Sequence, residues 1–307
     1  MNKKKRIKRY ISVLILLVNI FFSVKGQENT IWLVDSLPLQ EKYLNELNSV
    51  SVLKHSPIEV SNKLVRAVLD KQPAFGVYKD NMMVTGVPIN KTPTKSNSDI
   101  FFQFSIRHRI TKSWLPFQSF LYLTYTQKSF WNVYESSSPF RDNNYNPGIG
   151  IGRYLILNNK LKGAFTLQLE HESNGRGGLE SRSWNYVNFS GKYFYNMRTS
   201  IKAEALIPFV DGENNKDLLR YRGYGTISID HIDKRNLWWF SLKLRPGDKF
   251  VNFNTEFSVA YKVSSKWNQY LMLHFYNGYG ESLLDYKEFT SMVRIGFTIK
   301  PDFFNPY

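Results

Sequence analysis

The chain has 307 residues, with 41 Lys and Arg against 25 Asp and Glu, and its formal net charge is +16. An aromatic content of 16% with 21% charged residues is unlike that of a disordered chain or of a protein built from many apolar transmembrane helices. The absence of cysteine excludes disulfide frameworks, thiolate metal sites and a cysteine nucleophile.

Residues 1–26 have the layout of a secretory signal peptide. A cationic stretch at 3–9 precedes an apolar stretch at 10–24, and small or flexible residues follow, so we predict cleavage near Gly26. A signal anchor is the alternative, but the apolar stretch is shorter than the roughly 18 residues that a spanning helix needs. Because this leader holds seven of the basic residues and no acid, the basic total gives little support for nucleic-acid binding, and we expect no nucleic-acid partner.

Residues 27–72 are predicted to form a short N-terminal periplasmic extension. Two segments, 37–47 and 60–69, have apolar residues at helix-like spacing. Short helices or a partly ordered tail are the expected structures, and the role of the extension is not legible from the sequence.

From residue 73 onward the dominant hydrophobic period is two. Phe165, Leu167 and Leu169, for example, alternate with Thr166 and Gln168. The same alternation recurs in the segments 100–107, 238–245, 253–262 and 293–300. Dyad alternation over about ten residues per segment is typical of a transmembrane β-barrel, although a soluble β-sandwich has the same period.

Three features favour the membrane: the strands are long, the inward face carries many charges, and aromatic residues such as Trp131, Trp184, Trp238, Trp267 and Tyr276 lie near strand ends. We predict an all-β fold, a twelve-stranded antiparallel transmembrane β-barrel over residues 73–307. The predicted strands are 73–86, 99–110, 118–131, 146–156, 162–173, 184–195, 198–209, 221–232, 237–246, 252–263, 267–277 and 289–301. The even number and the alternation of short turns with long polar loops fit a bacterial barrel, in which short turns face the periplasm.

Polar residues interrupt a lipid-facing register at the upper end of the fifth predicted strand. The outward series Phe165, Leu167, Leu169 continues into His171 and Ser173. Residues two apart on a strand point the same way, so an imidazole there can reach a seryl oxygen.

The sixth predicted strand begins its outward series with Asn185. A histidine that accepts a serine proton and is oriented by a third side chain is the arrangement of an activated nucleophile. Asn185 would fix the imidazole tautomer, but it lacks the negative charge that an aspartate would supply. The pair alone is a weak signal; its place on a lipid-facing register, where polar groups are costly, strengthens it.

The motifs around these residues resemble the active-site signature of the outer-membrane phospholipase A family. They are HESNGR at 171–176, SRSWN at 181–185, YTQKS at 125–129, SSPFR at 137–141 and YNGYGESLLDY at 276–286. The resemblance covers residue 73 to the end of the chain. It implies a twelve-stranded outer-membrane barrel with its active site towards the outer leaflet. The implied activity is calcium-dependent hydrolysis of phospholipid acyl esters (phospholipase A1/A2 and lysophospholipase) by a homodimer.

Carried over residue by residue, the resemblance assigns roles to individual side chains. It implies Ser173 as nucleophile, His171 as general base, Asn185 as orienting residue and the Gly175 N–H as an oxyanion donor. Ca²⁺ would be bound by the Arg176 carbonyl, the Ser181 hydroxyl and Ser137 of the partner subunit, and oxygen ligands of this kind suit a hard cation. The departures are local: Glu172 lies between base and nucleophile, and residues 27–72 have no counterpart.

Gln127 is the predicted dimer-interface residue. It continues the outward register of Leu121, Leu123 and Tyr125, so in a lone barrel its amide would face hydrocarbon without partners. A twofold contact would offer it its own copy.

Two other classes remain open. A passive porin or adhesin would share the barrel, and a lipid A deacylase or outer-membrane protease would be an enzyme with another signature. The repeated glycines Gly148, Gly150 and Gly152 lie inside a predicted strand, which indicates packing rather than a nucleotide loop.

Overall fold

The computed structural model describes residues 61–247, 253–264 and 268–307, so the predicted signal peptide and the segment 37–47 lie outside the described residues. The helical elements are α3 (Asn62–Lys71), α4 (Leu218–Arg222), η1 (Pro116–Gln118) and η2 (Gly178–Glu180). The strands are β1 (Phe75–Val77), β2 (Asn81–Pro88), β3 (Asp99–Arg109), β4 (Ser119–Trp131), β5 (Phe140–Leu157), β6 (Lys160–Ser173), β7 (Ser183–Phe194), β8 (Thr199–Asp211), β9 (Gly225–Ile232), β10 (Trp238–Pro246), β11 (Phe253–Lys262), β12 (Tyr270–Tyr279) and β13 (Phe289–Ile299).

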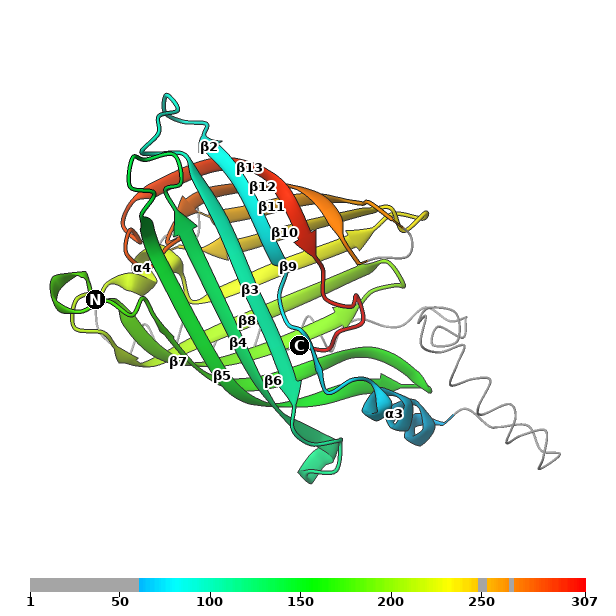
Figure 1. Ribbon diagram of the computed structural model, residues 1–307. Coiled ribbons are helices and arrows are strands. Elements are labelled where there is room, and N and C mark those ends of the chain that lie inside the picture. Colours follow the sequence, from blue (N-terminus) through cyan, green and yellow to red (C-terminus); the bar gives the residue numbers. More distant parts are fainter. Residues whose placement is uncertain (1–60, 248–252, 265–267) are drawn as a thin grey trace.

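The strands form one antiparallel sheet that closes into a barrel (Figure 1). β1 and β2 both pair with β3 and together fill one position, so twelve strands surround the lumen, as predicted. The first predicted strand is therefore divided in two. At the break, the backbone N–H of Ser105 donates to the Asn81 side chain, and the Ser105 hydroxyl accepts from the Lys79 N–H, so side chains replace ladder bonds.

The predicted inward and outward registers are confirmed. On β6, Leu167 and Leu169 are 45% and 48% exposed, whereas Gln168 and Glu170 are both 2% exposed. The lumen-facing charges pair with one another, as when Arg294 bonds both Asp99 and Glu281. Apolar side chains therefore face outward to lipid while ion pairs fill the interior, which is the division a membrane barrel requires.

The three glycines of β5 are packing residues. A Cβ added at Gly150 would lie 2.8 Å from the Tyr122 ring, and one at Gly152 would lie 2.5 Å from the Phe120 ring. Large aromatic side chains of β4 occupy this space inside the lumen. The expectation that the repeated glycines serve packing is confirmed.

Two of the five aromatic residues expected near strand ends lie there but face the lumen. Trp184 is 1% exposed and Tyr276 is 5% exposed, and both have the inward register of their strands. The loops at their end of the barrel fold inward and cover them. Trp267 lies outside the described residues.

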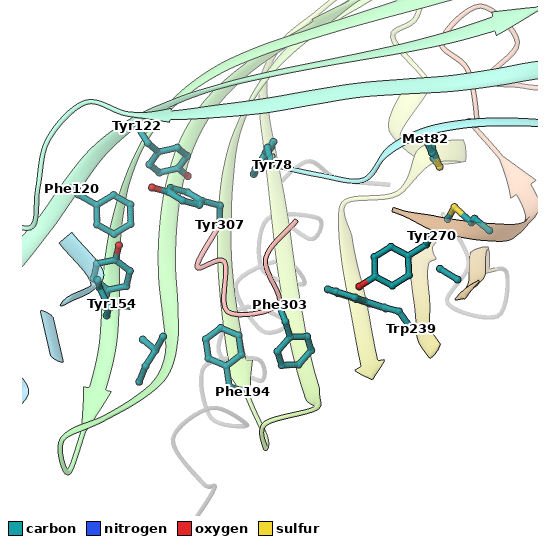
Figure 2. Packing of buried hydrophobic residues seen from close by; sticks show 14 of the residues in the cluster. Tyr78, Met82, Phe120, Tyr122, Tyr154, Phe194, Trp239, Tyr270, Phe303 and Tyr307 are labelled. Atoms are coloured by element: carbon teal, nitrogen blue, oxygen red, sulfur yellow. The ribbon is translucent and has the colours of Figure 1, made fainter. Parts of the chain in front are cut away.

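The chain ends inside the barrel. β13 ends at Ile299, and the remaining residues turn into the lumen, where Tyr307 is 6% exposed and packs on Phe120 and Tyr122 with ring centroids 5.5 and 4.7 Å apart (Figure 2). Lys192 donates to the carbonyls of Phe303 and Asn305. The terminal aromatic is thus part of a plug and does not extend the last strand.

A second apolar cluster lies at the opposite end, under the long loops. It contains Trp184, Tyr186, Leu218, Leu219, Leu283 and Tyr286. The residues of α4 belong to this cluster, which explains why the strand predicted from 221 starts only at 225. Between the two clusters lies a polar cavity of about 210 Å³ whose walls include Lys128, Glu170 and Lys243.

Helix α3 lies at the end of the barrel that carries the short turns. It contacts β5 and β6, and Arg109 donates to the carbonyls of Leu69, Asp70 and Gln72 at its C-terminus. The helical spacing predicted over 60–69 is therefore confirmed. Among the described residues, no helix has the length and apolar character needed to cross a membrane.

Candidate active site

His171 and Asn185 lie directly opposite each other on β6 and β7. The Nδ1 atom of His171 and the Oδ1 atom of Asn185 are 2.9 Å apart and form a hydrogen bond. An amide oxygen only accepts, so Nδ1 carries the proton and Nε2 is left as the acceptor. The structure thus brings together two of the three residues predicted to form the triad.

Ser173 follows on the same outward face of β6, opposite Ser183 on β7 and Tyr145 on β5. Its side chain is half-buried. Within the described part of the chain, its hydroxyl forms no direct hydrogen bond with His171. The backbone register places the two side chains as neighbours on one face, the separation over which a serine and an imidazole can meet.

A buried cluster lies on the lumen side of β6 and β7, opposite the face that carries His171 and Ser173. It was not predicted from the sequence. Glu172 is 3% exposed and accepts from Arg222 of α4 at 2.8 Å and from the indole of Trp184 at 3.0 Å. Trp184 directly faces Glu172 across the β6–β7 pair and stacks on Tyr186 with ring centroids 3.9 Å apart. The signal available in the sequence was the acidic residue at an inward position between two outward polar ones.

A second buried network of hydrogen bonds fixes the backbone of β6 at His171. The Asn146 side chain donates to the backbone carbonyl of His171 at 2.9 Å and to the Tyr186 hydroxyl at 3.1 Å. The Tyr186 hydroxyl donates in turn to Glu170 at 2.9 Å. These contacts link β5, β6 and β7 at the level of the candidate site.

The loop after β6 is held by Asn174. Its Oδ1 accepts from the N–H groups of Arg176 and Arg182, and its Nδ2 donates to the Glu180 carbonyl. Gly175 has a φ of +67°, and a Cβ there would lie 3.0 Å from the Tyr145 ring. Only glycine combines this backbone conformation with so close a neighbour.

The predicted metal ligands Arg176 and Ser181 lie in the same loop, on either side of η2. The Arg176 guanidinium is directed to Glu180 and to the Arg141 carbonyl, away from its own backbone carbonyl. Ser137 lies in the loop after β4 at the same end of the barrel, and it is exposed. Within residues 61–247, no hydrogen bond joins the Ser137 side chain to Arg176 or Ser181.

The predicted dimer residue Gln127 has partners within its own chain. It accepts from the Tyr125 hydroxyl at 3.1 Å and donates to the Ser129 hydroxyl at 3.2 Å. The premise that this amide lacks partners in a lone barrel is therefore wrong, because three polar residues in the same register satisfy one another.

Comparisons with known proteins agree with this geometry. Residues 74–299 match the family model for phospholipase A1. The chain belongs to the phospholipase A1 family. The phospholipase A1 of Escherichia coli K12 is 30% identical over 210 residues, which cover 64% of this chain and 68% of that protein.

Solved structures share the barrel. The Salmonella typhi outer membrane phospholipase, a dimer with bound calcium, superimposes with a TM-score of 0.68 over 80% of this chain and 100% of that one, at 23% identity. Outer membrane phospholipase A from Escherichia coli gives a TM-score of 0.65 over 74% of this chain and 98% of that one, at 24% identity. Family membership identifies a phospholipase, and the solved structures show that it shares their closed β-barrel fold.

Proposed function

We propose that this phospholipase cleaves acyl esters with Ser173 as nucleophile, His171 as general base and Asn185 as the orienting residue. The observation that carries the proposal is the hydrogen bond between His171 Nδ1 and Asn185 Oδ1 on a lipid-facing rim. With Nδ1 occupied, Nε2 is free to take the proton of the Ser173 hydroxyl as its oxygen attacks the ester carbonyl. The same nitrogen then returns the proton to the leaving glycerol oxygen.

The site lies at the barrel end opposite the short turns and α3, which we assign to the outer leaflet. There, an acyl chain can stay in the hydrocarbon while its ester reaches Ser173. Leu167 and Leu169, directly below His171 in the same register, supply the apolar surface for that chain.

The Gly175 N–H is proposed as a donor to the oxyanion. Its left-handed backbone conformation turns the chain directly after Ser173, so the loop can present an N–H towards the reacting carbonyl. Because Gly175 has no Cβ, the space beside the Tyr145 ring also stays open.

We also propose that Ca²⁺ binds at this loop. Among the described residues, no group of three or more His, Asp and Glu side chains is arranged to hold a metal. The donors that the family resemblance implies are the Arg176 carbonyl, the Ser181 hydroxyl and Ser137 of a second copy, and with water they form a set of hard oxygen ligands that fits calcium. When bound, calcium would supply positive charge that stabilises the oxyanion, which compensates in part for the charge stabilisation that a neutral Asn185 cannot give.

The proposed active form is a homodimer. Ser137 is exposed at the end of the barrel that carries the Arg176–Ser181 loop, a position from which it can reach the loop of a second copy. Gln127 and Tyr125 are partly exposed on the lipid-facing side of β4, with the buried Ser129 hydroxyl bonded to Gln127, and this part of β4 is the surface we assign to the contact. The Salmonella typhi relative with bound calcium is a dimer.

A passive porin or adhesin is the main alternative, and the C-terminal segment with its aromatic residues, which fills the periplasmic half of the lumen, argues against a porin. Fatty-acid release from mixed phospholipid vesicles, with calcium and with excess chelator, separates the candidates. The proposal predicts calcium-dependent release from phospholipid. Release from lipid A alone, peptide cleavage alone, or no hydrolysis at all would each contradict it.

A further inference from the structure

The loop between β3 and β4 exposes two aromatic side chains at the periplasmic end of the barrel. Trp114 is 75% exposed and Phe117 is 81% exposed. Ile110, which is 47% exposed, continues the outward register of β3, and its N–H donates to the Leu121 carbonyl at 2.8 Å. The loop is therefore continuous with the lipid-facing surface of β3 and β4 (Figure 1).

Helix α3 fixes the shape of this loop. The N–H and hydroxyl of Ser113 donate to Asp70 at 3.1 and 2.8 Å, and Arg66 donates to Gln118. The Ser119 hydroxyl closes the turn on the Pro116 carbonyl at 2.7 Å. The polar groups of the loop thus bond to α3 or to the loop itself, whereas the side chains of Trp114 and Phe117 remain exposed to solvent.

The backbone of the loop is strained where it presents its aromatic residue. Phe117 and Gln118 both have a φ of +59°, a left-handed conformation that bulky residues rarely adopt. Such strain persists only where surrounding contacts hold it, and it concentrates at functional positions. Here the contacts with α3 hold Phe117 in an exposed position.

Exposed cations lie on the same loop as these aromatic residues and on the helix and strand beside it. Lys63 lies on α3, Lys112 lies in the loop, and Arg153 on β5 faces Ser119 across the β4–β5 pair. Asp70 is the one acidic residue within 61–72 and 110–118, and it is engaged by Ser113. Aromatic residues rimmed by positive charge match the border between acyl chains and anionic headgroups.

We propose that residues 61–72 and 110–118 form a membrane anchor for the periplasmic leaflet of the outer membrane. Trp114 and Phe117 enter the interfacial layer, and Lys63, Lys112 and Arg153 bind anionic phospholipid headgroups. This assigns a role to the part of the N-terminal extension that the structure describes. The anchor is separate from the hydrolytic site, so its test does not depend on the proposed catalytic residues.

The first test uses the absence of cysteine in the chain. A Phe117→Cys variant is labelled with an environment-sensitive fluorophore and reconstituted in vesicles of phosphatidylcholine and phosphatidylglycerol. A Lys234→Cys variant, in the turn between β9 and β10 at the same end, is the matched control. Nitroxide-bearing lipid should quench the label at 117 several-fold more than the label at 234. Equal quenching, or equal access of both labels to a water-soluble quencher, would overturn the anchor.

The second test addresses the charges. Spin-labelled phosphatidylglycerol and phosphatidylcholine report which lipid is enriched around the reconstituted barrel. The double variant Lys112→Gln/Arg153→Gln should lose most of the preference for phosphatidylglycerol, whereas the control Lys234→Gln/Arg235→Gln should keep it. Equal losses in both would refute specific headgroup binding. Disulfide cross-linking of Phe117→Cys copies, independent of lipid composition, would instead identify a second copy as the occupant and overturn the proposal.

Discussion

The carboxylate of Glu172 is bound inside the barrel by the guanidinium of Arg222 at 2.8 Å. Glu172 lies between the proposed base and nucleophile in the chain, with its side chain on the opposite face of the strand. Its second partner, Trp184, immediately precedes Asn185 on β7. The inward contacts therefore hold β6 and β7 together at the level where His171 meets Asn185.

Replacing Arg222 should lower the stability of the barrel at the end that carries the candidate site. Arg222→Met would leave the buried Glu172 carboxylate without its charge partner, which typically costs about 3–5 kcal/mol of stability. The double variant Glu172→Gln/Arg222→Met should recover most of that loss, because no buried charge is left unpaired. Unfolding monitored by circular dichroism measures both effects. Equal stability of wild type and Arg222→Met would show that the ion pair between β6 and α4 does not stabilise this end of the barrel.

Calcium removal should abolish turnover reversibly. Ser181→Ala should raise the calcium concentration needed for half-maximal activity, because one proposed oxygen ligand is lost while the loop keeps its Asn174 contacts. Ser96→Ala, at an exposed loop position on β2–β3, is the control and should leave the calcium requirement unchanged. Full activity in excess chelator, with no retained metal, would contradict the calcium proposal.

At limiting calcium, where loss of the Ser137 ligand should leave little turnover, mixing two variants should restore activity if a partner supplies Ser137. A Ser137→Ala chain keeps its triad but offers no ligand to its partner, and a Ser173→Ala chain offers the ligand but lacks the nucleophile. Random pairing of equal amounts should give about one quarter of wild-type turnover, since half the dimers contain one complete site. Ser136→Ala, at the neighbouring exposed serine, should be active alone. No recovery in the mixture would place Ser137 outside the active site.

The barrel should conduct no ions, because aromatic residues and the C-terminal segment fill its periplasmic half. The double variant Phe303→Ala/Tyr307→Ala removes two of the buried rings from this plug. Single-channel recording in planar bilayers should detect conductance only in the variant. Steady conductance by the wild type would support the porin alternative.

Much of the fold could be predicted from the sequence, because period-two alternation specifies which residues face lipid. The outward series through Leu169 to His171 and Ser173 was legible for this reason, as was the helix over 60–69. The break between β1 and β2 was not, since it depends on Asn81 and the Ser105 backbone meeting across two strands.

Contacts between segments that are distant in the sequence could not be predicted from it either. The pairing of Glu172 with Arg222 joins residues 50 apart, and nothing in either local pattern indicates it. The inward turn of the chain after Ile299 also escaped prediction, because a terminal aromatic such as Tyr307 fits either the strand or the lumen. The partners of Gln127 were overlooked although Tyr125 and Ser129 stand in its own register.

The most direct test of the proposed nucleophile compares phospholipid hydrolysis by Ser173→Ala and by the wild type in saturating calcium. Both proteins are also treated with a long-chain alkylsulfonyl fluoride, which labels an activated serine. Removing a nucleophile usually lowers turnover by several orders of magnitude. We expect that loss in a barrel of unchanged circular dichroism, a milder loss for Asn185→Ala, and sulfonylation of the wild type at Ser173 alone. Wild-type turnover by Ser173→Ala, or sulfonylation at another residue with loss of activity, would contradict it.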